Sequence, residues 1–440
     1  MRPLGKFAPL IDRHRGSLVR IGWVMGSGLA SRAAQLAVMT IVARRLGPTD
    51  YGQFIFAIGT ATVAGMLGNL GWQFSFNRFF AVARRRDDEG ELLGLMRASN
   101  RVNLLGALTA AAVLAVAGLM AQELAFGLLA AAILTIPMAI TLLRRQQLAG
   151  TGQSAVALVL DQGFASIVLL VAVLAGQLTL TEMLAIYAVA LAAGNIGASL
   201  LVRRKLPAAL RQVKPRYELA TWLRVSLNLM QARLARILLS RIDVLLLPVL
   251  ASLAAAGIYG AAFRATYFMA FSQFVLQTVN GPQFAEAFAA GQIARVRRIL
   301  KLSLVFSLAT SLPWLALFVV FPGTVMRVLF GADYADGAWP LVLIAIGQFA
   351  FCLCGPFNAL LANGGREREM VRLSYAVLVG SLALSFALIP SLEAVGAAIV
   401  VLCSSAALLV GQAWLSRDVL GASTDRDGAE AKRTGPESDS

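Results

Sequence analysis

Uninterrupted apolar runs recur along the whole chain and constrain its fold more than any other feature. Many contain about 20 residues, which as a helix is long enough to cross a membrane hydrocarbon core roughly 30 Å thick. The runs do not alternate with a period of two, as the strands of a membrane barrel would. Of the 440 residues, 58% are hydrophobic and only 14% are charged, unlike a soluble domain. The sequence therefore predicts an all-α integral membrane protein.

We expect twelve transmembrane helices. They span roughly residues 21–43, 53–77, 102–121, 124–143, 155–176, 182–202, 225–250, 258–289, 302–321, 338–362, 373–390 and 394–416. The basic, amphipathic N-terminus, 1–20, has no cleavage pattern after the apolar run that follows it, so we expect it to be retained. The last stretch, 417–440, is polar and predicts a disordered cytoplasmic tail.

The basic residues indicate the orientation of the helices. If the N-terminus is cytoplasmic, 31 of the 39 lysines and arginines lie in the tails and inward connections, whereas only Arg44, Arg45 and Arg327 face outward. This asymmetry follows the positive-inside rule. It predicts a multi-pass protein with both termini in the cytoplasm. Because the charge lies between apolar runs, the net charge of +16 does not indicate a nucleic-acid partner.

The two halves of the chain resemble each other weakly. "LGPTDYGQF" at 46–54 matches "AAGIYGAAF" at 255–263, and "LAGTGQ" at 148–153 matches "LANGGR" at 361–366. Both offsets are close to 210 residues, which indicates a duplicated unit. We therefore expect two lobes of six helices related by a pseudo-two-fold axis along the membrane normal. The N-lobe would span 21–203 and the C-lobe 225–416, joined by a basic cytoplasmic linker, 204–224.

One expected helix carries several charges at membrane depth. Arg233, Arg236, Ser240 and Asp243 are spaced by three, four and three residues, which places them within about 80° of one another on a helix. A charged residue at the bilayer centre costs about 2.5 to 3.5 kcal/mol. This face should therefore look into protein or water, while Arg241, off the stripe, should pack against a neighbouring helix.

Three other expected helices carry polar stripes. Their members are Ser31, Arg32 and Gln35 with Ser27, then Asn69, Gln73 and Asn77 next to Arg78, and finally Arg264, Gln273, Gln277 and Asn280. A shared, hydrated cavity with a positive lining would satisfy all of these groups. The alternatives are that single amides only hydrogen-bond neighbouring helices, and that arginines near helix ends, Arg78 above all, extend to the headgroups.

Three acidic residues lie in the expected helices: Asp161, Asp243 and Glu286. A carboxylate whose proton or sodium occupancy changes with conformation could couple transport to an ion gradient. Alternatively, Asp243 only neutralises Arg236 or Arg241.

Several chemistries have no support in the sequence. The five lysines have no glycine-rich phosphate cradle, and with His14 as the one histidine there can be no histidine-based metal site or catalytic dyad. The longest outward connection, 322–340, is too short for a large catalytic loop. We therefore expect no enzyme activity, metal or cofactor.

Arginine outnumbers lysine 34 to 5, and its planar guanidinium group suits the recognition of phosphate oxygens.

Four segments resemble a known family. They are "VARRLGPTDYGQFIFAIGTATVAGMLGNLGWQFSFNRFFA" at 42–81, "IDVLLLPVLASLAAAGIYGAAFRA" at 242–265, "GPQFAEAFAAGQIARVRRIL" at 281–300 and "LFGADYADGAWPLVLIAIG" at 329–347. In this order they resemble the Wzx-like O-antigen and exopolysaccharide flippases of the multidrug, oligosaccharidyl-lipid and polysaccharide (MOP) exporter superfamily. The resemblance covers roughly residues 22–414.

The resemblance implies two lobes in a V shape, alternating access and a substrate of polyprenyl pyrophosphate carrying a short sugar chain. The pyrophosphate would pair with Arg32, Arg233, Arg236 and Arg264 in a cavity where Coulomb attraction is less damped than in bulk water. It also implies a bacterial inner-membrane location, contact with membrane lipids, a role in lipopolysaccharide or exopolysaccharide synthesis, and a polysaccharide polymerase or synthesis complex as a partner.

Other functions are less favoured. A drug-type antiporter of the same superfamily, carrying cationic drugs, would favour an acidic cavity, and the deep positions here hold more arginines than carboxylates. Peptidoglycan-precursor flippases usually have two more helices. A non-transport scaffold of a polysaccharide synthesis complex would retain its function without these arginines.

Overall fold

The computed structural model describes residues 8–205, 213–269 and 271–433. Side chains are described from Gln35 onward, apart from several in 155–162, 268–279 and 418–433. Within this part of the chain every regular element is a helix, so the all-α prediction is confirmed. Contacts divide the chain into two compact units, 1–232 and 233–440, and each is described by itself.

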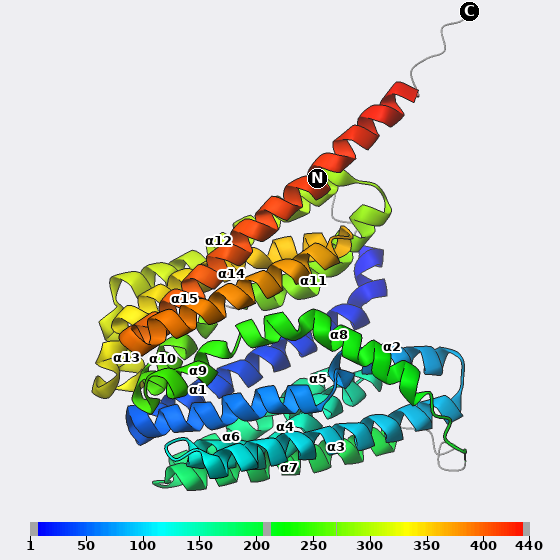
Figure 1. Cartoon of the computed structure of the whole chain (residues 1–440). Coiled ribbons are helices and arrows are strands. Elements are labelled where there is room, and N and C mark those ends of the chain that lie inside the picture. The colour runs from blue at the N-terminus through cyan, green and yellow to red at the C-terminus, as the bar shows by residue number, and fades with distance from the viewer. Residues whose placement is uncertain (1–7, 206–212, 270, 434–440) are drawn as a thin grey trace, which may run out of the picture. The chain divides into compact units, whose positions relative to one another are not determined.

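The described part of unit 1 contains eight elements and most of a ninth. They are α1 (Ala8–Gly68), α2 (Trp72–Arg85), α3 (Glu89–Met120), α4 (Ala125–Gly150), α5 (Ser154–Leu158), the π-helix η2 (Val159–Gly163), α6 (Phe164–Ala175), α7 (Leu180–Lys205) and α8 (Leu219–Leu239). Helix α4 packs against α1, α2, α3 and α7 and so lies at the centre of the unit (Figure 1).

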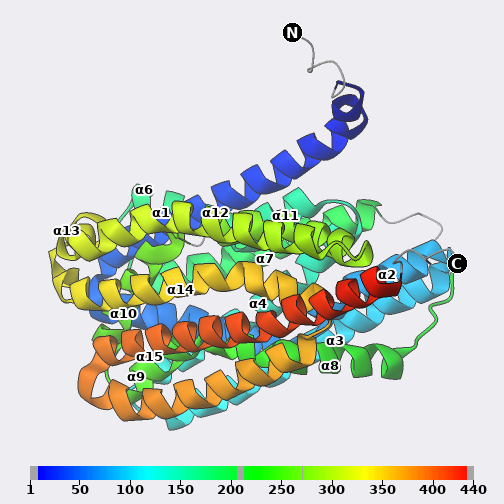
Figure 2. The same cartoon turned by 90° about the horizontal axis from the view of Figure 1, so that it is seen from above.

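Unit 2 begins with the end of α8. The elements that follow are α9 (Ile242–Leu250), α10 (Leu253–Ala265), the 3-10 helix η4 (Thr266–Phe268), α11 (Phe271–Ala289), α12 (Ile293–Val320), α13 (Pro322–Phe330), the 3-10 helix η5 (Ala332–Gly337), α14 (Ala338–Asn363) and α15 (Glu367–Arg433). Helix α14 packs against α10, α11, α12 and α15 (Figure 2). Helix α15 reaches into 417–440, for which the disordered tail stays a prediction.

All twelve expected segments fall in helical structure, but the helices are joined and broken differently. Helix α1 holds the first expected segment and most of the second and bends at Gly47 (φ 74°), and α15 holds the last two and bends at Glu393 (φ 47°). Conversely, turns at 69–71 and 240–241 interrupt the second and the seventh expected segments. Among the described residues, seven helices are long and apolar enough to cross a membrane, because the breaks leave the other pieces shorter or richer in charge.

The two units meet in the chain within α8, downstream of the expected linker. In unit 1, Trp222 on α8 is buried against Trp72 with ring centroids 6.3 Å apart, and the hydroxyls of Ser226 and Ser75 are 2.6 Å apart. In unit 2, Ala235 joins a buried cluster at the other end of α8.

The linker is tied to unit 1 just before α8 begins. The backbone N–H of Arg216 donates to the carbonyl oxygen of Gly90 at 2.9 Å, and its guanidinium lies 2.9 Å from the carboxylate of Asp88. A Cβ at Gly94 would lie 1.8 Å from the carbonyl oxygen of Arg216, so a larger residue there would push the linker away.

The close approach of α1 and α3 predicts a stability difference between two glycine substitutions. A Cβ at Gly106 would lie 2.0 Å from the carbonyl oxygen of Gly68. The carbonyl oxygen belongs to a helix backbone and cannot move aside as a side chain could. Gly106→Ala should therefore lower the free energy of unfolding by about 1 to 3 kcal/mol. Thermal unfolding of the purified protein in detergent measures the change.

Gly197→Ala on α7 is the matched control, because a Cβ there meets no atom within 4 Å. It should leave the midpoint unchanged or raise it slightly, since alanine is the better helix former by about 1 kcal/mol. Equal losses in the two variants would contradict the contact between α1 and α3.

Candidate functional site

The break between α1 and α2 carries one of the predicted polar stripes. Leu70 (φ 50°) and Gly71 (φ 83°) adopt left-handed conformations that end α1. The side-chain oxygen of Asn69 accepts a hydrogen bond from the backbone N–H of Gln73 at 2.7 Å, which satisfies a donor in the first turn of α2. The Asn69 amide donates to the side-chain oxygen of Asn103 on α3 at 2.8 Å. Asn103 in turn donates to the carbonyl oxygen of Ala139 on α4 at 3.1 Å.

The rest of this stripe becomes progressively more exposed along α2. Gln73 is half-buried, and its side-chain nitrogen is enclosed without a hydrogen-bond partner among the described residues. Asn77 is exposed and donates to the side-chain oxygen of Gln146 at 2.7 Å. Arg78 is exposed as well. Asn69 itself is fully buried, so the contacts described here are those of helix packing, and a lining role for it stays a prediction.

The second polar stripe begins in unit 2 at the end of α8. Arg236 is exposed and donates to the side-chain oxygen of Asn358 on α14 at 2.5 Å. The same oxygen accepts a hydrogen bond at 3.3 Å from the amide of Gln412 on α15, a side chain that is only 2% exposed. Arg233 is exposed and close enough to Arg236 to repel it electrostatically. Two guanidinium groups therefore lie together, one of them held by a neutral amide.

The turn at 240–241 separates the stripe into two environments. Ser240 is exposed and donates to the backbone carbonyl of Ile237 at 2.7 Å. Beyond the turn, Asp243 on α9 is 3% exposed and accepts a hydrogen bond from the hydroxyl of Tyr259 on α10. Of the two arginines considered as its counter-charge, Arg241 is the one whose charge acts on this carboxylate.

The remaining described candidates of unit 2 have local partners. The guanidinium of Arg264 donates to the hydroxyl of Tyr267 at 3.1 Å and lies 5.0 Å from the centre of its ring. Asn280 is buried, and its amide donates to the hydroxyl of Ser303 on α12 at 2.9 Å. Glu286 is exposed and lies 3.5 Å from Arg295.

Other predicted residues cannot be placed in the site. Gln35 lies half-buried in α1. The side chains that fall outside the described residues are those of Ser27, Ser31, Arg32, Asp161, Gln273 and Gln277. The shared cavity therefore stays a prediction. Within the described part of the chain, no cluster of three or more metal-ligating side chains occurs.

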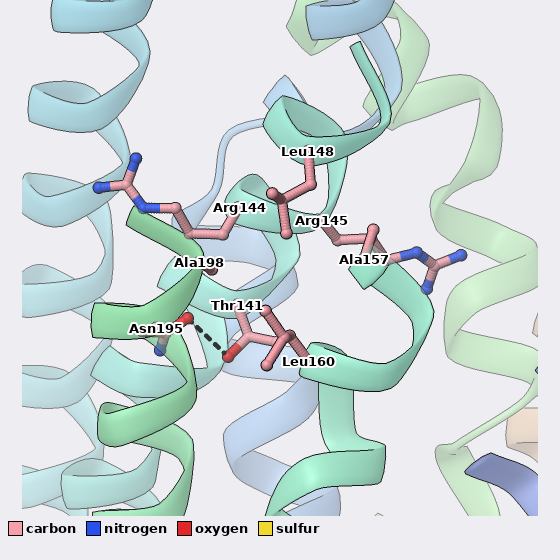
Figure 3. Close-up of a pocket in the computed structure, with 8 residues that line it drawn as sticks. All are labelled: Thr141, Arg144, Arg145, Leu148, Ala157, Leu160, Asn195 and Ala198. Atoms are coloured by element: carbon pink, nitrogen blue, oxygen red, sulfur yellow. Dashed lines mark hydrogen bonds between the residues drawn. The ribbon is translucent and has the colours of Figure 1, made fainter. Parts of the chain in front are cut away.

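Arg144 on α4 was missed by the sequence analysis, although it lies among the polar groups of unit 1. Its guanidinium donates to the side-chain oxygen of Gln147 at 2.5 Å, and the amide of Gln147 donates to Asn100 on α3 at 3.1 Å. Figure 3 shows Arg144 and Arg145 directed to opposite sides of a narrow pocket that Thr141 and Asn195 also line. The only signal in the sequence was an arginine pair at a helix end, which the positive-inside rule alone explains.

The described helices define a class of fold, an all-α membrane protein. An inward-facing multidrug resistance MATE family transporter of the MOP superfamily superposes with a TM-score of 0.72 at 15% identity, covering 93% of this chain and 99% of its own. The lipid II flippase MurJ in an inward closed conformation gives 0.69 at 11% identity, covering 94% and 93%. The eukaryotic MATE transporter AtDTX14 gives 0.59 at 12% identity, covering 93% and 98%.

The family follows from the sequence. A sequence profile described as "Polysaccharide biosynthesis protein" matches residues 18–288, which is more than half of the chain. The chain belongs to this family, and the expected resemblance is confirmed at that level. No curated protein matches it in sequence.

The buried Asp243–Tyr259 pair generates a prediction about stability. Tyr259→Phe removes a donor from a carboxylate that is 3% exposed. Leaving a buried acceptor without its partner costs about 1 to 3 kcal/mol, so the midpoint of thermal unfolding should fall. In a double-mutant cycle, Asp243→Asn combined with Tyr259→Phe should cost less than the sum of the single changes. Strict additivity would show that the two groups do not interact.

Proposed function

We propose that the protein is a flippase that moves a polyprenyl-pyrophosphate-linked oligosaccharide from the cytoplasmic to the periplasmic leaflet of a bacterial inner membrane. Membership of the polysaccharide biosynthesis family supports a sugar substrate. The fold shared with MATE transporters and with a lipid II flippase supports alternating access. The sugar-pyrophosphate head would cross the membrane inside the protein while the polyprenyl tail stays in lipid.

The observation that carries this proposal is the environment of Arg236. Its guanidinium is held by the amide oxygen of Asn358, and the like charge of Arg233 acts on it. No carboxylate of the described residues pairs with Arg236, so its full positive charge remains available. A planar guanidinium can form two parallel hydrogen bonds to phosphate oxygens. Arg32 and Arg264 would complete the cationic site, with the polar stripes as its lining.

The same arrangement disfavours the drug-type alternative. A cavity for cationic compounds needs uncompensated carboxylates, whereas the two acidic candidates with described side chains have partners. Asp243 is buried against Tyr259, and Glu286 lies beside Arg295. A cationic drug would meet Arg233 and Arg236 with like charge.

Energy coupling belongs to the proposal as well. Asp243, Asp161 and Glu286 are the acidic groups that could take up a proton or sodium ion. Of the two whose side chains are described, Asp243 and Glu286, Asp243 has the more suitable surroundings, because one of its oxygens is enclosed with no hydrogen-bond partner among the described residues. Loading or unloading that oxygen would change a buried charge just beyond the turn at 240–241, which follows the helix α8 that carries Arg236. After transport, a polysaccharide polymerase or synthesis complex would take up the lipid-linked oligosaccharide.

Transport provides the first test. Purified protein in vesicles should move a labelled polyprenyl-pyrophosphate oligosaccharide between leaflets, and Arg233→Ala with Arg236→Ala should lower the rate at least about tenfold, because one lost charged contact of ~1.4 kcal/mol gives that factor. The measurement is the fraction of label accessible from outside over time. A scaffold would show no movement at all, and undiminished movement in the double variant would remove the arginines from the mechanism.

Binding provides the second test, through the amide that holds Arg236. Asn358→Asp retains both hydrogen bonds, since Arg236 and Gln412 each donate to the same oxygen, but it adds a negative charge. Affinity for inorganic pyrophosphate should fall about fivefold, which corresponds to the ~1 kcal/mol of one ion pair near a surface. Isothermal titration of the purified protein measures it.

The control is Asn363→Asp on the same helix, where the amide donates to the carbonyl oxygen of Ala359. It introduces the same charge away from Arg236, so pyrophosphate affinity should not change. If the wild type binds no pyrophosphate, the proposed substrate is wrong. If it binds but Asn358→Asp binds equally well, only the role of the amide is wrong.

A further inference from the structure

A second arginine, in unit 1, is held in the same way as Arg236. The guanidinium of Arg144 donates to the carboxamide oxygen of Gln147, and Gln147 is fixed by its hydrogen bond to Asn100. Gln147 is fully buried, so this support is rigid. In both units, then, a guanidinium rests on a neutral amide that a second amide secures from another helix.

Among the described residues, no carboxylate forms an ion pair with Arg144, and its Nε is enclosed with no hydrogen-bond partner there. Helices α4 and α7 pack against each other, and the hydroxyl of Thr141 on α4 donates to the side-chain oxygen of Asn195 on α7 at 3.2 Å. This packing brings Arg203, in the last turn of α7, close enough to Arg144 for its like charge to act on it. Arg144 is half-buried and Arg203 is exposed. The repulsion between these two like charges would be relieved by an anion bound to both.

The position of this pair indicates the kind of anion. Arg144 lies near the end of α4 and Arg203 near the end of α7, both at the ends that the charge distribution assigns to the cytoplasmic side. Basic groups between helices at this level bind phosphate-bearing headgroups. The pocket in Figure 3 is too narrow to hold even a water molecule, and Arg144 points away from it. The anion would therefore contact the outer edge of the guanidinium.

We propose that Arg144 and Arg203 form a phosphate-binding site at the cytoplasmic end of unit 1. Its ligand is a phosphate carried by an anionic lipid headgroup of the inner leaflet. Free phosphate shares the chemistry and is the second source to be tested. The alternative, in which Gln147 simply satisfies a structural arginine, requires no anion.

Native mass spectrometry of the purified full chain tests the proposal. The probes are phosphatidylglycerol, phosphatidylethanolamine and inorganic phosphate. The wild type should bind phosphatidylglycerol in preference to phosphatidylethanolamine. Arg144→Ala should weaken phosphatidylglycerol binding about fivefold, the equivalent of the ~1 kcal/mol that one basic residue contributes near an anionic surface.

Gln147→Glu is the second variant and does not remove the arginine. It places a carboxylate against Arg144 in nearly the same shape, and Asn100 can turn its amide to donate to it. The fold is retained while the positive charge is cancelled, so binding should fall as in Arg144→Ala. Arg145→Ala is the control, because the neighbouring arginine points to the other side of the pocket.

Each outcome is decisive. Weaker binding in Arg144→Ala and Gln147→Glu but not in Arg145→Ala supports the site. Displacement of the lipid by millimolar inorganic phosphate would assign the site to free phosphate and overturn the lipid assignment. Unchanged binding in both variants, or an equal loss in Arg145→Ala, would overturn the site itself. Because no transport is measured, these results do not depend on the flippase proposal.

Discussion

The closure of the helix break at 69–71 is the interaction on which the rest of unit 1 depends. A backbone group left without a hydrogen bond in a membrane costs several kcal/mol, so a helix can be interrupted there only if other groups take over. Asn69 satisfies the start of α2 and, through Asn103, binds α3 and α4 as well. The three residues of the break thus end α1 and allow α2 to begin, and the side chain of Asn69 fixes the break to the centre of the unit. Without this closure α1 would continue straight, and α2 could not approach α8 at Ser226.

The turn at 240–241 in unit 2 changes the direction of the chain between α8 and α9. The backbone N–H groups of Ser240 and Arg241 bond back to carbonyls of α8, so the turn remains hydrogen-bonded without help from distant side chains. It changes the direction in which residues on either side project. Arg236 reaches α14, whereas Asp243 reaches α10. The break therefore separates positive from negative charge along what reads as one stripe, which prevents the carboxylate from neutralising the arginine.

This difference explains what the sequence could and could not predict. The twelve helical segments follow from hydropathy, which is a property of each segment alone. The stripe from Arg233 to Asp243 was derived for a straight helix, and the turn at Ser240 has no glycine or proline to reveal it. The hydrogen-bond partners of the arginines could not be predicted from the sequence either. Asn358 and Gln412 lie more than a hundred residues from Arg236, and Arg144 resembled an ordinary positive-inside residue until its contact with Gln147 was seen.

The use of amides instead of carboxylates to hold Arg144 and Arg236 has a physical consequence for any anion carrier. A carboxylate would position a guanidinium equally well, but an incoming phosphate would then have to displace it and leave it as an unpaired buried charge. An amide oxygen fixes the orientation of the guanidinium and leaves its net charge unchanged. The anion can then bind and leave without breaking an ion pair within the protein, so that neither step requires a large reorganisation. A carrier that must release its cargo on the far side of a membrane gains more from this moderate, reversible attraction than from tight binding.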